Sequence, residues 1–270
     1  LFRYFHEIGK QFFEKIDTDL KVIGAENIPK DKAILYAVSH RSSVTDAFMV
    51  TFLPDIANTT TVIEQAFFRD SLGADKLLDE LEEKGEVIWT KKLIPVGKEG
   101  EVQYDVYATI RDMLMKGKNV IIAPEGTTMT TSPYRETRPL QWGIANIFLK
   151  YPELMGKVVI VPVTLDDPSK LAADALQIAL VNAPKEMRVV ISEPVDPEKI
   201  LTEVGGTVGV KPEDNMKLEY FRAVTSSIRV KWNKALGLES FPKVEEILYR
   251  WQTKEKVKTS IEQVISENCK

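Results

Sequence analysis

Short apolar runs alternate with amphipathic segments through most of the chain. The apolar runs have the length and β-branched content of buried strands, and they lie at 21–24, 33–38, 59–63, 93–96, 119–123, 157–165 and 187–192. Between them, apolar residues recur at the three- and four-residue spacing of amphipathic helices, at 46–53, 72–84, 102–113 and 140–149. Strands that alternate with helices predict an α/β fold, with a central mixed, partly parallel sheet flanked by helices.

Both ends of the chain have a helical pattern without strands. Over residues 1–16 the apolar positions form one stripe, made of Phe5, Ile8, Phe12 and Ile16 with Phe2 and Phe13 at its margins. This stripe has two interpretations: the helix docks on the protein's own core, or it lies on a membrane surface. Residues 213–236 and 241–267 are helical and charged. We therefore predict an amphipathic helix at 1–20, an α/β domain at 21–210 and a helical C-terminal extension at 211–270.

Composition narrows the classes of function. Among the 270 residues, 36 Lys and Arg stand against 40 Asp and Glu, so the net charge is -4. This balance is evidence against a nucleic-acid binder that depends on bulk positive charge. A single cysteine, Cys269, excludes an intrachain disulfide framework, and only two histidines are present, His6 and His40. We therefore expect no metal site.

The sequence says less about the cellular compartment of the protein than about its class of function. No run approaches the ~18 apolar residues of a spanning helix, and no signal peptide precedes the first strand. We expect a peripheral membrane protein on a cytoplasmic face, or a soluble protein in a reduced compartment. Because the sequence begins with Leu1, an anchor further upstream stays an alternative.

The first candidate for chemistry is a histidine that follows a predicted strand. His40 comes directly after the apolar run 33–38 and Ser39, and Asp46 stands at the start of a predicted helix. A carboxylate that accepts a hydrogen bond from one ring nitrogen fixes the tautomer and leaves the other nitrogen free to take a proton from a hydroxyl. The alternative is a structural histidine, with Asp46 capping the helix.

Three further motifs follow along the chain. Ala123-Pro124-Glu125-Gly126-Thr127 comes after a strand, where glycine admits close approach of a ligand and Glu125 could orient a hydroxyl or a cation. Ile94-Pro95-Val96-Gly97-Lys98 ends in a lysine that could hold a phosphate. Val161-Pro162-Val163 places a proline inside a strand, which predicts an edge or irregular position. For the motif around Glu125 the alternative is a loop with turn residues, and for Lys98 it is a solvated surface lysine.

Taken in chain order, the four motifs resemble those of the glycerolipid acyltransferase family, the lysophosphatidate and glycerol-3-phosphate acyltransferases. That family has a His-x4-Asp motif, a block ending in Arg, Pro-Glu-Gly-Thr-Arg-Ser, and Val-Pro-Val. The segment Val22 to Pro29 also resembles the family's lead-in to its histidine. The resemblance covers about residues 20–165.

Three positions depart from the family pattern. One extra residue separates His40 from Asp46, giving His-x5-Asp. A loop would absorb it, whereas within a helix it would turn Asp46 away by ~100°. Lys98 stands where the family usually has Arg, and keeps the charge without the bidentate geometry. Thr128 stands where the family has another Arg, a cation that Arg135 or Arg138 could supply.

The resemblance implies O-acyl transfer from acyl-CoA or acyl carrier protein to a glycerol-3-phosphate or lysophospholipid hydroxyl at a membrane surface, in phospholipid biosynthesis or remodelling. It implies that His40 is the general base and Asp46 its orienter, with no cofactor besides the thioester donor. The substrate-binding positions it implies are Arg41, Ser42, Lys98, Glu125, Gly126, Thr127 and Arg135. Two alternatives remain at this stage: a non-catalytic lipid-binding relative and an acyl-thioester hydrolase.

Overall fold

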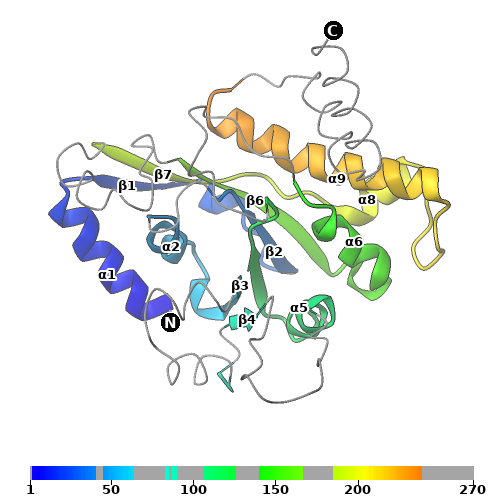
Figure 1. The fold of residues 1–270 in the computed structure, drawn as a ribbon, viewed down its shortest axis with the longest axis horizontal. Coiled ribbons are helices and arrows are strands. Elements are labelled where there is room, and N and C mark those ends of the chain that lie inside the picture. The colour runs from blue at the N-terminus through cyan, green and yellow to red at the C-terminus, as the bar shows by residue number, and fades with distance from the viewer. Residues whose placement is uncertain are drawn as a thin grey trace, which may run out of the picture.

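A mixed sheet organises the protein (Figure 1). The computed structural model describes residues 2–40, 45–63, 83–84, 87–89, 106–125, 140–166 and 185–238. In the described residues seven strands form one sheet in the order β1-β7-β6-β2-β5-β3-β4. Their bounds are β1 Asp19–Ile23, β2 Ala33–Val38, β3 Thr59–Ile63, β4 Val87–Trp89, β5 Asn119–Ile122, β6 Val158–Asp166 and β7 Glu186–Ile191. Neighbouring strands are parallel except β6 and β7, which confirms the predicted mixed sheet.

Helices cover both faces of the sheet (Figure 1). On one side lie α1 (Phe2–Lys15) and α2 (Thr45–Met49), the latter followed by a 3₁₀ turn at Val50–Phe52. On the other lie α5 (Val106–Met115), α6 (Gly143–Lys150), α8 (Pro197–Glu203) and α9 (Asp214–Ala235). α9 packs against β6 and α6 and buries Tyr220, Val224 and Trp232 in this core. The protein thus has the predicted α/β architecture.

The core is divided by the alternation of side chains along the strands. On β2, Ile34, Tyr36 and Val38 face α1 and α2, while Leu35 and Ala37 face the helices opposite. Buried strand residues on both faces are expected where helices cover both sides of a parallel sheet. The continuous apolar run at 33–38, which shows no alternation with polar residues, has this physical cause.

The N-terminal helix docks on the protein's own core, as far as its side chains are described. Phe13 and Ile16 are buried, at 4% and 7% exposure. Phe12 stacks near Phe48, and Phe13 meets Phe52 edge-on. The docking interpretation is therefore confirmed for Phe13 and Ile16, which are buried, and Phe12 packs partly buried against the same core. The side chains of Phe2 and Phe5 lie outside the described residues.

Pro162 lies at an irregular position of a central strand. β6 runs between β2 and β7, so its proline is not on an edge. Val163 pairs with Ile191, and Ile160 pairs with Val195. Two residues of β6 (161–162) therefore face three residues (192–194), which is a bulge. The missing N–H of a proline is tolerated where the ladder is interrupted in this way.

The remaining differences concern short elements. β4 has three residues and α8 has seven, too few for a hydrophobic period to be recognised in the sequence. The helix predicted at 72–84 (apart from 83–84), the run at 93–96 and the helix at 241–267 lie outside the described residues. In the part of the chain that the structure describes, no helix is long and apolar enough to cross a membrane.

Candidate active site

The candidate site lies where three parallel strands end. β2 pairs with β5 on one side and with β6 on the other, both in parallel. Their carboxyl ends therefore meet at one edge of the sheet, which is where open α/β sheets bind ligands. His40 follows β2 at this edge, and Glu125 follows β5. The fold thus brings together two motifs that are separated by 85 residues in the sequence.

His40 and Asp46 form a hydrogen-bonded pair, which confirms the predicted contact. The distance from His40 Nδ1 to Asp46 Oδ2 is 3.0 Å. The Asp46 side chain is 5% exposed, whereas the His40 side chain is 32% exposed. A carboxylate at this position makes Nδ1 the protonated ring nitrogen, so Nε2 carries the lone pair. The arrangement therefore offers an oriented base to a molecule approaching from solvent.

The extra residue between the two side chains does not separate them. α2 begins at Thr45, and Asp46 is its second residue. The extra residue therefore does not turn Asp46 away, since its side chain meets the His40 ring at 3.0 Å. The pair retains hydrogen-bond geometry although its spacing in the sequence differs from that of the family.

Glu125 contacts His40 through the main chain. The backbone N–H of His40 donates to Glu125 Oε1 at 2.9 Å, and Glu125 is 3% exposed. We expected this carboxylate to orient a hydroxyl or a cation, and the structure shows it accepting from an amide. Its predicted place in the acceptor site remains a prediction.

The sequence predicts no role for Ser39, which lies directly before His40, but the structure shows two hydrogen bonds between it and β6. Ser39 is fully buried. Its N–H donates to Val163 O, and its Oγ accepts from the N–H of Leu165, both at 2.9 Å. A serine between an apolar strand and a histidine is the only sequence signal for this contact, and such serines are common. Sequence reasoning therefore missed it.

The other predicted site residues lie outside the described residues: Arg41, Ser42, Lys98, Gly126, Thr127 and Arg135. The convergence of Lys98, Arg41 and Arg135 on one anion site beside His40 stays a prediction. In the described part of the site, hydrogen bonds join His40 to Asp46 and to Glu125, and Ser39 binds β6 beside them.

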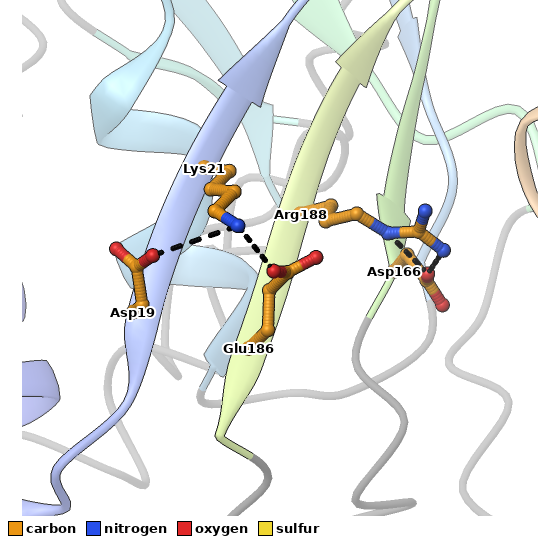
Figure 2. Close-up of polar contacts among 5 residues, drawn as sticks. All are labelled: Asp19, Lys21, Asp166, Glu186 and Arg188. Atoms are coloured by element: carbon orange, nitrogen blue, oxygen red, sulfur yellow. Dashed lines mark hydrogen bonds and ion pairs between the residues drawn. The ribbon is translucent and has the colours of Figure 1, made fainter.

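A second polar cluster lies on β1, β7 and β6 (Figure 2). Lys21 bridges Glu186 and Asp19, and Arg188 pairs with Asp166. The hydrogen bond from Lys21 lowers the pKa of Glu186, and the same bond raises the pKa of Lys21. We call these five residues the charged ladder. The Lys21 and Glu186 side chains are 49% and 44% exposed, so this pair is solvated.

Comparison with known families and structures agrees with the geometry. The family model named Acyltransferase matches residues 19–166, which is more than half of the chain. The chain belongs to the acyltransferase family. The matched segment contains His40, Asp46 and Glu125 and extends to the end of β6. This acyltransferase therefore carries its hydrogen-bonded histidine within the segment that defines the family.

A solved structure has a similar fold. The crystal structure of the 1-acyl-sn-glycerophosphate (LPA) acyltransferase PlsC from Thermotoga maritima matches with a TM-score of 0.50 and 17% identity. The match covers 89% of this chain and 81% of that chain. At this identity the likeness establishes a shared fold. No curated protein matches the chain.

Proposed function

We propose that this acyltransferase moves a fatty acyl group from acyl-CoA or acyl carrier protein to a glycerol-3-phosphate or lysophospholipid hydroxyl, in phospholipid biosynthesis or remodelling. The observation that carries the proposal is the accessible His40, held by the buried Asp46 at 3.0 Å. An acyl transfer that starts from a hydroxyl needs a base of this kind. The family match supports an acyl donor, and the motif resemblance suggests that this donor is a thioester.

The proposed reaction proceeds by direct attack. His40 Nε2 takes the proton of the acceptor hydroxyl while the hydroxyl oxygen attacks the thioester carbonyl carbon. The tetrahedral intermediate collapses, the carbon–sulfur bond breaks, and the imidazolium returns the proton to the departing thiolate. Asp46 stabilises the imidazolium by accepting from Nδ1–H. The sequence of steps uses no acyl-enzyme, metal or further cofactor.

Acceptor binding is assigned from the family resemblance. Lys98, Arg41 and Arg135 supply positive charge for the acceptor phosphate in this proposal, because phosphate recognition relies on charged hydrogen-bond donors. Ser42, Gly126 and Thr127 line the same site. The charge on Lys98 is a point charge, so it gives less geometric discrimination than the arginine usual in the family.

We also propose peripheral contact with a membrane surface, as a lysophospholipid acceptor resides there. The support is the start of the amphipathic stripe, Phe2 and Phe5, since Phe13 and Ile16 are already buried in the core. Flotation with anionic vesicles should fall in the double variant Phe2→Ser and Phe5→Ser. The matched control is the double variant Val208→Ser and Val210→Ser, which removes two apolar side chains that are 39% and 61% exposed. Equal flotation of all forms would place the contact elsewhere.

The function is tested by thiol release over a panel of acceptors: glycerol-3-phosphate, lysophosphatidate, lysocardiolipin and none. Acceptor-dependent release with formation of the ester supports the proposal and identifies the acceptor. Release of equal rate without acceptor would make the protein a thioester hydrolase. Lipid binding without release, for every donor and acceptor, would make it a non-catalytic relative.

A further inference from the structure

The backbone of β2 gives its amides alternately to its two neighbours. Ala33 N donates to Lys157 O and Ser39 N donates to Val163 O, so the odd-numbered residues face β6 and the segment before it. Ile34 N donates to Asn119 Oδ1, and His40 N donates to Glu125 Oε1, so the even-numbered residues face β5. This alternation identifies which main-chain bond each side chain replaces.

On the β6 side, the hydroxyl of Ser39 replaces a carbonyl. In a parallel ladder that contains the bond from Ser39 N to Val163 O, the N–H of Leu165 would donate to the carbonyl of Ser39. It donates to Ser39 Oγ instead. The buried N–H of Leu165 is therefore satisfied while the backbone is released from the ladder. The chain turns away from β6 at the residue before His40.

On the β5 side, Pro124 ends the ladder. A proline has no N–H to donate to β2, and the carbonyl of Pro124 accepts from Gln141 N. The amide of His40 thus has no main-chain partner on β5, and the carboxylate of Glu125 takes that place at 2.9 Å. Asn119 makes the equivalent contact at the start of β2, with Ile34 N at 3.0 Å. Side chains of the β5 segment therefore cap both ends of β2.

We propose that Glu125 and Ser39 are positioning residues for His40, acting through its main chain. They hold the turn that directs the imidazole toward Asp46: Glu125 reaches the His40 amide from the β5 side, and Ser39 anchors the residue before His40 to β6. This inference rests on the proposed role of His40 as the base. It assigns Glu125 a function other than the acceptor contact expected from the sequence.

Steady-state kinetics with varied acceptor separate the two roles of Glu125. Glu125→Ala should lower kcat about 10²-fold, the size of effect that a misplacement near 1 Å produces, with little change in acceptor KM. Glu125→Gln retains an oxygen acceptor for the His40 amide and should recover most of the lost turnover. Ser39→Ala should lower kcat in the same way, by about tenfold. Asn119→Ala removes the side-chain acceptor of the buried Ile34 amide at the other end of β2. This variant should destabilise the protein without lowering kcat.

The second readout needs no activity. The chain has only two histidines, so histidine-selective ¹⁵N labelling gives two imidazoles, assigned with a His40→Gln variant. His40 should be the Nδ1–H tautomer in the unmodified protein and in Asn119→Ala, and should lose that preference in Glu125→Ala. His6, whose Nδ1 lies 3.2 Å from Thr51 O, is the internal reference and should not change.

Two results would overturn the proposal. One is a raised acceptor KM in both Glu125 variants, with an unchanged kcat and an unchanged His40 tautomer, which would make Glu125 a substrate-binding residue. The other is an unchanged tautomer in a folded Glu125→Ala protein of normal turnover. If the unmodified protein transfers no acyl group, the proposed function fails, but the tautomer measurement still decides whether Glu125 orients His40.

Discussion

The cluster around His40 and the Lys21–Glu186 pair of the charged ladder both place a carboxylate beside a nitrogen-bearing side chain, yet they differ in burial and in what the carboxylates contact. Asp46 and Glu125 are 5% and 3% exposed, and they bind the ring and the amide of one histidine. In the ladder, the Lys21 and Glu186 side chains are about half exposed and bind each other. The two buried carboxylates at His40 fix the direction of its ring and its amide, whereas the solvated Lys21–Glu186 pair only brings opposite charges together.

Burial decides whether a carboxylate contact is loosely held or fixed in one geometry. An exposed ion pair gains little, because water screens it and both long side chains lose conformational freedom. A buried carboxylate has to be satisfied by hydrogen bonds, so its partners are held in one geometry. At the end of β2 that geometry belongs to a histidine that remains reachable from solvent, with 32% of its side chain exposed.

The largest expected effect is the loss of the base. His40→Ala should lower kcat by about 10²–10⁴-fold, or more if no other group replaces the base. The fold should survive, because the His40 side chain is partly exposed. An acyl-transfer assay measures kcat and a thermal melt measures the stability of the fold. His6→Gln, at the other histidine, is the matched control. Near-normal turnover in a folded His40→Ala protein would remove His40 from the mechanism.

Asp46→Asn should have the next largest effect, a loss of about 10²-fold in kcat. The amide cannot accept from Nδ1–H with the strength of a carboxylate, so the imidazolium is less stabilised. The control is Asp55→Asn, an exposed aspartate at a left-handed turn position that asparagine also tolerates. If both substitutions lower kcat equally, the pair at 3.0 Å has no special role in catalysis.

Lys98→Gln should act on binding more than on turnover. Loss of a charged contact to the acceptor phosphate should raise acceptor KM about tenfold. Lys98→Arg, which restores the residue usual in the family, is the control and should keep or lower acceptor KM. An acceptor KM and kcat that do not respond to Lys98→Gln would indicate a solvated lysine.

The sequence allowed the sheet and the pair to be predicted for local reasons. The strands at 33–38 and 119–123 were recognisable because helices cover both faces of the sheet and the runs are apolar throughout. His40 and Asp46 lie six residues apart, so a strand end followed by a helix start already places them together. The short α8 and the burial of the N-terminal stripe depended on packing against distant segments, which local periodicity does not encode.

The main-chain contacts of Ser39 and Glu125 were beyond sequence reasoning for a different reason. Each depends on the register of two strands: Ser39 meets Leu165 across 126 residues, and Glu125 meets His40 across 85. Pro124 can be seen in the sequence, but that it ends the pairing of β5 with β2 can be inferred only when the register of the two strands is known. A motif can therefore suggest residue types for a reaction, while the supporting contacts follow from strand order.

The smallest expected effect concerns the charged ladder. Glu186→Gln should leave kcat unchanged and lower Tm only slightly, because the pair is solvated. The pKa of Glu186 is lowered from 4.5 by the bond with Lys21, so its contribution to stability is present above that pH and is lost as the pH falls through the folded-state pKa. The difference in Tm between the two forms should therefore vanish in acid, and also in about 1 M salt, where the Debye length is near 3 Å. Thermal melts across pH and salt, with kcat measured alongside, test this. If Glu186→Gln lowered kcat as much as Asp46→Asn, the charged ladder would contribute to catalysis, and the distinction between the two clusters would be wrong.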